Sequence, residues 1–201
     1  MRLTDKEGEL AVRIARDVVD HVVKGDETPE YENLPDIFYE KMGAFVTLEK
    51  HPQKELRGCI GIPYPIYPLI EALIEAAEGA ALHDPRFPPV RPEELNNLIV
   101  EVSILTPPIK LDVKDRKELP KYIKIGEDGL IVKRGFYQGL LLPQVAVEEK
   151  WDPTTFLSYT CWKAGLPGDC WLDKDTEIYK FTAVIFAEEK PYGKIKRRKL
   201  L

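Results

Sequence analysis

The residues with the clearest chemical potential lie in the segment Leu56-Arg57-Gly58-Cys59-Ile60-Gly61. If the segment is extended, Arg57 and Cys59 point to the same side, because successive side chains of a strand alternate between its faces. A guanidinium beside a thiol favours the thiolate, so the pKa of Cys59 would fall below its ordinary value and the residue would become a nucleophile or a ligand. Gly58 and Gly61 permit close approach of a ligand or another backbone. We therefore interpret the segment as a candidate catalytic and substrate-binding loop.

The same residues also have a structural interpretation. Glycines form β-bulges and tight turns, a small free cysteine is among the residue types most often buried, and Arg57 could form an ion pair. Spacing alone leaves both interpretations of the segment open.

Further polar residues come from two later segments that the fold could bring near Cys59. His83 and Glu101 are candidates to handle protons beside a catalytic Cys59. The candidates for substrate binding, which would hold an anionic group, are Arg57, Gly58, Gly61, Asp84, Arg86 and Ser103. Each later residue has a structural alternative, because His83 could cap a helix, Asp84 could begin an Asp-Pro turn, and Glu101 and Ser103 could form the wet face of a strand.

Familiar metal and nucleotide motifs are absent from the sequence. It contains no Cys-x-x-Cys, His-x-x-x-His or His-Glu-x-x-His pattern, so we assign no metal ligands, although a site built from Cys59, His83 and Glu101 is conceivable. The segment Gly126-Glu127-Asp128-Gly129 lacks the Lys-Ser/Thr of a phosphate loop and is interpreted as a turn. These residues do not indicate which cofactor, if any, the protein uses, so we assign none.

Composition favours a folded protein of the cytosol. The chain has 201 residues, 44% of them hydrophobic and 31% charged, with a net charge of −5. No apolar stretch approaches the roughly 20 residues of a membrane-spanning helix, and the N-terminus is not signal-like. Cys59, Cys161 and Cys170 are an odd number without framework spacing, so we expect thiols rather than a disulfide.

Hydrophobic periodicity predicts an α+β fold, with mixed or antiparallel sheets and flanking helices. A capping box at Thr4-Asp5-Lys6-Glu7 begins a helix that ends at Gly25. Further helices are predicted from Pro68 to before Asp84-Pro85 and from Asp152 to Gly165. Strands are predicted at residues 43–48, 55–60, 98–105, 130–133, 136–142 and 178–186. The segment 107–120 is polar and bounded by prolines, which suggests a crossing between two lobes.

The C-terminal segment 190–201 is basic. Six cations and no acid occur in it: Lys190, Lys194, Lys196, Arg197, Arg198 and Lys199. Such a tail could bind nucleic acid by counterion release, or it could be a solvated, frayed chain end. The acidic remainder of the chain favours the second interpretation.

Several segments together resemble the AMMECR family. They are Phe45-Val46-Thr47-Leu48, Leu56-Arg57-Gly58-Cys59-Ile60-Gly61, Asp84-Pro85-Arg86-Phe87, Val100-Glu101-Val102-Ser103, Leu142-Pro143-Gln144-Val145-Ala146, Trp151 and Lys163-Ala164-Gly165. The resemblance implies a single domain over residues 1–201, with a larger and a smaller α+β lobe and a cleft between them. It carries no established biochemical activity. Genes of the family accompany a dioxygenase-like protein and a radical-SAM protein in some microbes, which implies a shared modification pathway. Many relatives have His where this chain has Asp128.

Three functional hypotheses follow. The first is an enzyme or small-ligand-binding protein that uses the Arg57-Gly58-Cys59 segment, in a pathway that modifies a nucleic-acid base or a cofactor. The second is a non-catalytic adaptor that binds a protein partner through Arg86-Phe87-Pro88-Pro89. The third is nucleic-acid binding through the basic tail. Exposed aromatic and proline-rich segments also suggest a homo-oligomer.

Overall fold

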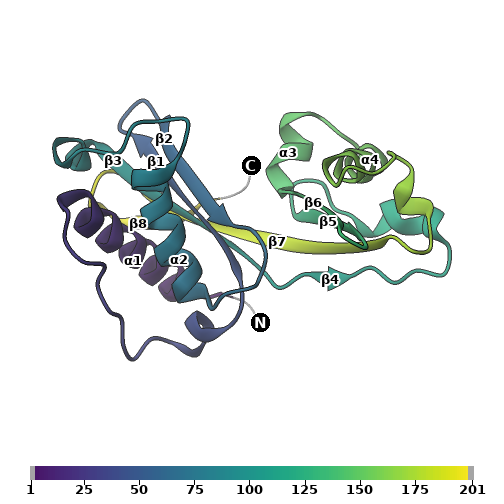
Figure 1. Ribbon diagram of the computed structural model, residues 1–201, viewed down its shortest axis with the longest axis horizontal. Coiled ribbons are helices and arrows are strands. Elements are labelled where there is room, and N and C mark those ends of the chain that lie inside the picture. Colours follow the sequence, from purple (N-terminus) through teal and green to yellow (C-terminus); the bar gives the residue numbers. More distant parts are fainter. Residues whose placement is uncertain (1–2, 199–201) are drawn as a thin grey trace. The chain divides into compact units, whose positions relative to one another are not determined.

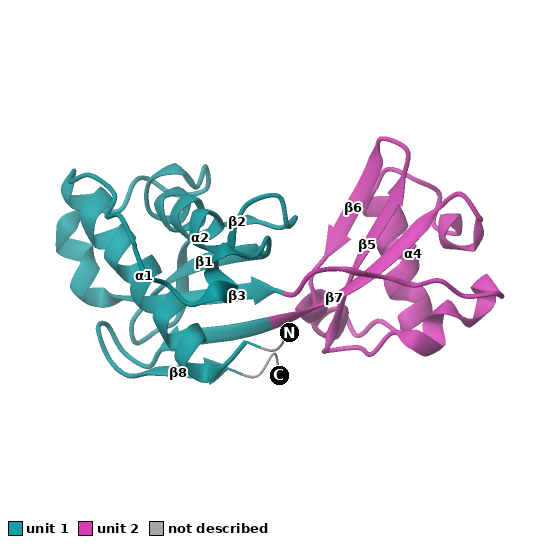
Figure 2. Cartoon of the chain, turned by 90° about the horizontal axis from the view of Figure 1, so that it is seen from below, with its two compact units in different colours: residues 1–105, 184–199 teal, residues 106–183, 200–201 magenta. Residues whose placement is uncertain are grey.

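The computed structural model describes residues 3–198 and combines helices with antiparallel sheets, which confirms the predicted α+β class. The chain divides into two compact units, drawn in teal and magenta in Figure 2. Unit 1 contains residues 3–105 and 184–198, and unit 2 contains residues 106–183. Strand β7 (Glu177–Glu188) contributes residues to both units. Within the described range, no helix is long and apolar enough to cross a membrane.

The sheet of unit 1 is antiparallel and positions the candidate site. Its central strand β1 (Gly43–Lys50) pairs with β2 (Glu55–Ile62) and with β3 (Leu98–Leu105). The end of β7 follows β3, and β8 (Ile195–Arg198) pairs with β7. The bounds of β3 agree with the sequence prediction, and its alternating Val100, Val102 and Ile104 are buried as expected. These residues form the inner face of the sheet.

Two helices cover that inner face (Figure 1). Helix α1 (Asp5–Lys24) begins with the predicted capping box between Thr4 and Glu7 and ends at Gly25, whose φ is +81°. Helix α2 (Leu69–Glu78) continues as a π-helical turn, Gly79–His83. The short helices η1 (Asp36–Tyr39) and η3 (Pro92–Asn97) complete the unit. Ala72, Leu73, Val46 and Val102 are fully buried in the shared core.

Unit 2 has its own sheet and core. Strand β5 (Asp128–Arg134) lies between β6 (Tyr137–Leu141) and the first part of β7, which also pairs with β4 (Ile109–Lys110). The helices are η4 (Arg116–Tyr122), α3 (Pro143–Glu148), α4 (Pro153–Lys163) and η5 (Cys170–Leu172). As predicted, Asp152 caps α4, its carboxylate accepting the Thr155 N–H at 2.7 Å.

The expectation that all three cysteines are thiols was wrong. Cys161 and Cys170 form a disulfide, with their Cα atoms 6.1 Å apart, and only Cys59 is free. Cys161 lies near the end of α4 and Cys170 begins η5, and both side chains are fully buried in the core of unit 2. The turn through Gly165 brings the two helices together, which their separation in the sequence did not reveal.

The interpretation of residues 190–201 as a frayed tail was also wrong for the part that the structure describes. Residues 195–198 form β8, and three of the cations pair with acids of unit 1: Lys196 with Glu189, Arg197 with Asp5, and Arg198 with Glu101 and Glu49. Lys199 lies outside the described residues. Strand pairing with β7 and these ion pairs hold the segment in place.

Candidate functional site

The Arg57-Gly58-Cys59 segment lies in a strand, as the predicted strand at residues 55–60 implies. It lies in β2, at the edge of the unit 1 sheet. Leu48 pairs with Gly58 while Glu49 pairs with Leu56, so Arg57 is the extra residue of a β-bulge. The bulge interrupts the two-residue alternation from which we predicted that Arg57 and Cys59 point to the same side.

Arg57 has structural partners instead of the thiol. Its Nε and Nη2 donate to the two carboxylate oxygens of Glu94 at 2.8 and 3.0 Å, and Nη1 and Nη2 donate to the carbonyls of Pro88 and Pro89. The side chain is only 7% exposed. Because Arg57 donates to Glu94, it holds the pKa of that carboxyl below its ordinary value. Arg57 therefore fastens the Pro88–Pro89 segment to β2 and is not available for an anionic substrate.

Asp84 and Arg86 satisfy the free edge of β2 at Cys59. The buried Asp84 carboxylate accepts the Cys59 N–H at 2.8 Å and the Arg86 N–H at 3.0 Å. Arg86 donates through Nε and Nη2 to Asp84 and through Nη2 to the Cys59 carbonyl at 3.1 Å. The two side chains thus take the place of a neighbouring strand, and Asp84 positions Arg86 rather than binding a substrate itself.

Gly58 is required by close packing. A Cβ at this position would lie 2.1 Å from the carbonyl oxygen of Ala80, in the π-helical turn after α2. A Cβ at Gly61 would strike the ring of Phe45 at 2.2 Å. Both glycines therefore have structural roles that follow from what covers them.

We expect Gly58→Ala to destabilise the protein by about 2–3 kcal/mol, because the clashing atom is a backbone oxygen, which cannot turn aside as the end of a side chain can. The matched control is Gly135→Ala. A Cβ at Gly135 would meet no atom within 4 Å, and its φ of +60° costs about 1 kcal/mol for a non-glycine residue. Urea unfolding of the two variants measures the difference. Equal losses of stability would show that the contact with Ala80 is not limiting.

Three polar residues, Cys59, Thr47 and Glu101, form a row across the outer face of the sheet. Thr47 lies opposite Cys59 on one side and Glu101 on the other, and residues directly opposite each other in antiparallel strands share a face. The Thr47 hydroxyl donates to the Cys59 sulfur at 3.2 Å. Ser103, buried at 8% exposure, lies opposite Phe45 on the same face. The structure therefore brings Cys59, Glu101 and Ser103 onto one face of the sheet, with Thr47 between the first two.

Burial raises the pKa of the Cys59 thiol, which is the opposite of the predicted shift. The Thr47 hydroxyl and the Arg86 guanidinium work against this effect, whereas Asp84 and Glu101 add to it. Arg57 has no part in it, since its guanidinium donates to Glu94. Cys59 at neutral pH is a protonated thiol in this environment.

Alkylation of Cys59 by iodoacetamide is expected to be slow at pH 7 and to rise only at a pH above the ordinary thiol pKa of about 8.5, since the thiolate is the reacting form. Mass spectrometry across a pH series measures the rate, while the disulfide protects Cys161 and Cys170. Thr47→Val removes the hydroxyl that favours the thiolate, so its profile should move to still higher pH. An apparent pKa below 8.5 in the unaltered protein would contradict the assignment.

Glu101 forms an ion pair with a residue of the C-terminal segment, which we had interpreted as a frayed chain end. Arg198 of β8 pairs with both Glu101 and Glu49. Burial raises the pKa of Glu101, with Glu49 adding to the shift and Arg198 opposing it. The sequence around Arg198 did not indicate this ion pair, beyond the charge of the residue, because 97 residues separate it from Glu101. Thr47 could have been recognised from strand pairing, had the register been known.

His83 is not engaged with Cys59. Its side chain is 66% exposed and pairs with Glu78 at 3.5 Å, at the end of the π-helical turn. Asp128 is buried in unit 2, where its carboxylate accepts the Lys124 N–H and pairs with Lys180. Among the described residues, no group of three or more His, Cys, Asp or Glu side chains could hold a metal ion.

A family model described as AMMECR1 matches residues 12–186. The chain belongs to the AMMECR1 family. Protein PF1979 of Pyrococcus furiosus is similar, with 57% identity over 100% of this chain and 97% of its own length. Protein MJ0810 of Methanocaldococcus jannaschii is 55% identical over 99% of this chain and 98% of its own. The crystal structure of protein PH0010 from Pyrococcus horikoshii has a TM-score of 0.83 at 55% identity, covering 99% of this chain and 100% of that one.

For this AMMECR1 chain, the geometry divides the predicted site into two groups. Arg57, Gly58, Gly61 and Asp84 hold β2 against its neighbours. Cys59, Glu101 and Ser103 share the outer face of the sheet with Thr47, while Arg198 pairs with Glu101 and Arg86 donates to the Cys59 carbonyl. The second group can bind an anion, exchange a proton and donate a thiol hydrogen.

Proposed function

We propose that this AMMECR1 chain binds a small anionic molecule on the outer face of its unit 1 sheet and acts on it by proton transfer. The observation that carries the proposal is the placement of Arg86. Its side chain is 55% exposed, yet Asp84 and the Cys59 carbonyl fix the guanidinium beside the thiol. The exposed part of this guanidinium can donate to an anionic group.

Each residue of the row has a role in this proposal. Glu101 exchanges the proton, because a carboxyl whose pKa is raised by burial can act as an acid or a base nearer neutral pH. Cys59 donates a hydrogen bond to the ligand as a neutral thiol, and Ser103 offers a hydroxyl. Two strand spacings separate Cys59 from Glu101, about 10 Å in all, which suits a molecule of the size of a nucleobase or a small cofactor. A protein of this kind would act in the cytosol on metabolites, bases or cofactors.

The test uses three variants with a library of small phosphates and carboxylates, and ligand-observed NMR as the readout. Arg86→Lys keeps the charge but loses the forked geometry, so a true ligand should bind it at least ten-fold more weakly. The Glu101→Gln variant should still bind the ligand but should no longer convert it. Glu49→Gln is the matched control, since Glu49 also pairs with Arg198 but does not lie in the row with Cys59.

Two results would overturn the proposal. One is that no compound of the library binds the Arg86→Lys variant more weakly than it binds the unaltered protein. The other is a ligand whose conversion is lost equally in Glu101→Gln and Glu49→Gln, because the effect would then come from Arg198 rather than from a proton held by Glu101.

An adaptor is the second candidate function, and one observation favours it. Arg57 fixes the carbonyls of Pro88 and Pro89, so the exposed segment from Pro85 to Pro89 is held in one conformation. A preformed segment loses less entropy when a protein partner binds. In a pull-down, this function predicts that Cys59→Ala leaves binding of the partner intact while Phe87→Ala weakens it. The reverse pattern would reject the adaptor.

A further inference from the structure

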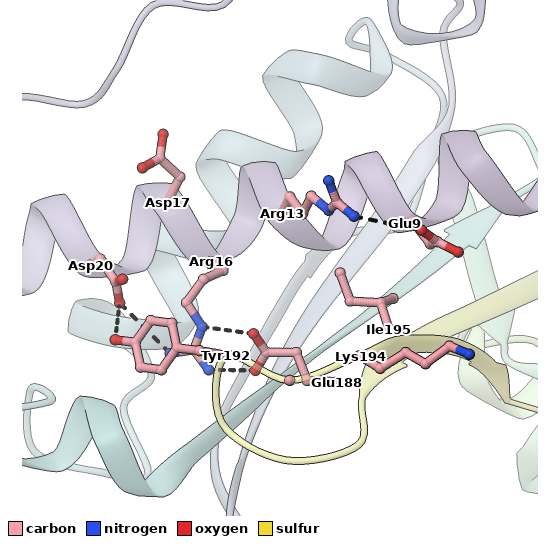
Figure 3. A pocket seen from close by; sticks show the side chains of 10 residues that line it. Glu9, Arg13, Arg16, Asp17, Asp20, Glu188, Tyr192, Lys194 and Ile195 are labelled. Carbon is pink, nitrogen blue, oxygen red and sulfur yellow. Dashed lines mark hydrogen bonds and ion pairs between the residues drawn. The ribbon is translucent and has the colours of Figure 1, made fainter.

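A pocket of about 450 Å³ lies in unit 1 between α1 and the turn that joins β7 to β8 (Figure 3). Its walls include Arg13, Arg16 and Asp20 of the helix, and Glu188, Tyr192 and Lys194 of the hairpin. None of these residues belongs to the outer-face row of Cys59, Thr47 and Glu101. The pocket is therefore a separate place where a ligand could bind.

Arg16 has one nitrogen that the protein does not satisfy. Nε and Nη2 donate to Glu188, and Nη2 also donates to the Leu98 carbonyl at 2.6 Å. Nη1 is buried and has no hydrogen-bond partner within the described chain. Its nearest acid is Asp20, at 3.6 Å, which is too long for a hydrogen bond. A buried donor without an acceptor is unfavourable, so an acceptor supplied by a ligand would stabilise it.

Tyr192 closes the pocket over this donor. Its ring lies over the Arg16 guanidinium, 4.3 Å from Cζ to the ring centroid, and its hydroxyl donates to Asp20 at 3.0 Å. Figure 3 shows the ring in front of the guanidinium. Tyr192 is itself 49% exposed, so solvent lies on its other side. Rotation of this one side chain would uncover the face of the guanidinium over which the ring lies.

The charged residues that line the pocket are four carboxylates, Glu9, Asp17, Asp20 and Glu188, and three cations, Arg13, Arg16 and Lys194. Each carboxylate already has a partner, and Asp17 accepts from the Tyr31 hydroxyl at 2.9 Å. Glu188 accepts from Arg16 and from the Val100 N–H, and Asp20 accepts from Tyr192. Arg13 pairs with Glu9 at 3.7 Å. Lys194 has no acidic partner in the described part of the chain. Among the described residues, Nη1 of Arg16 is thus a buried donor without an acceptor, and the exposed ammonium of Lys194 is a cation without an acidic partner.

We propose that this pocket binds a small oxyanion, a phosphate or a carboxylate. One oxygen accepts from Nη1 of Arg16 once Tyr192 has turned aside, and the negative charge faces Lys194 at the rim. Charge-assisted hydrogen bonds from a guanidinium suit both kinds of anion, because each presents several oxygens in a plane or a tetrahedron. The site is independent of the function proposed for the outer face.

The binding test is an NMR titration of the ¹⁵N-labelled protein with inorganic phosphate and, separately, with acetate. Sodium chloride keeps the ionic strength constant throughout. We expect saturable shifts of the amide signals of residues 192–195 and of the Nε signal of Arg16. Tighter binding of phosphate identifies a phosphate site, and tighter binding of acetate identifies a carboxylate site. Shifts that do not saturate with either anion, or that sodium chloride alone reproduces, would overturn the proposal.

Three variants then locate the anion. Lys194→Ala should weaken binding about two- to five-fold, and Asp20→Asn should strengthen it by a similar factor, because each changes one charge beside the pocket. Lys190→Ala is the matched control, since it removes the same charge from the same hairpin but Lys190 does not line the pocket. Equal effects of Lys194→Ala and Lys190→Ala, or weaker binding by Asp20→Asn, would show that the anion does not occupy this pocket.

Discussion

Arg16→Leu is expected to remove about 3–5 kcal/mol from the free energy of unfolding, because it leaves the carboxylate of Glu188 buried without its cation. Glu188 is 3% exposed and Arg16 is 6% exposed, and two hydrogen bonds of 2.5 and 3.0 Å join them. The Val100 N–H is the remaining donor to Glu188. Urea unfolding at neutral pH measures the loss.

Two controls separate the buried charge from the loss of an arginine. Arg13→Leu changes a side chain of the same helix that is 70% exposed, and it should change stability by no more than about 0.5 kcal/mol. The double variant Arg16→Leu, Glu188→Leu should be more stable than Arg16→Leu alone, since no uncompensated charge remains. If Arg16→Leu costs no more than Arg13→Leu, the ion pair does not stabilise the junction of α1 with β3 and β7.

Asp84→Asn is the second large effect, with an expected loss of about 2–3 kcal/mol. The carboxylate accepts from the backbone of Cys59 and Arg86 and from the Arg86 guanidinium, and an amide cannot accept all of these bonds. We give a value below that of a fully buried ion pair because the Arg86 side chain is 55% exposed. Asp26→Asn, an exposed carboxylate, is the matched control and should be neutral.

The effect of Asp84→Asn should also depend on pH. The hydrogen bond from Arg86 holds the pKa of Asp84 well below its usual range, and the Cys59 and Arg86 backbone N–H groups add to this shift against the opposing effect of burial. A carboxyl whose folded pKa lies below its unfolded value of about 4 stabilises the fold above that pH and loses this contribution as the pH falls. The difference in stability between the unaltered protein and Asp84→Asn should therefore shrink from pH 5 towards pH 2. A constant difference would mean that the charge of Asp84 is not what holds β2.

Local sequence determined the elements of unit 1 where neighbouring residues carry the information. The capping box of Thr4 with Glu7 and the glycine at position 25 gave both ends of α1, because a cap bonds to backbone three or four residues away. Alternation alone gave the bounds of β3 and its buried face, since every second side chain must enter the core. The candidate site was found in the same way, as an unusual set of chemical groups in the segments around Cys59 and Glu101.

The role of each candidate depended on contacts between distant residues. The bulge that removes Arg57 from the thiol follows from pairing with β1, and the partner of Arg57 lies 37 residues away. Asp84 reaches Cys59 across 25 residues, and Arg198 reaches Glu101 across 97. Sequence periodicity does not reveal contacts between residues so far apart. An arginine that binds a substrate and an arginine with a structural role therefore could not be distinguished from the sequence.

The sequence by itself therefore determined the α+β class, the family, and which segments carry reactive groups. Tertiary structure decided that burial raises the pKa of Cys59, that the other two cysteines are joined, and that residues 195–198 form a strand. The physical reason is the range of the interactions. Caps and strand alternation act over a few residues, whereas burial, ion pairing and disulfide formation depend on which segments the folded chain brings into contact.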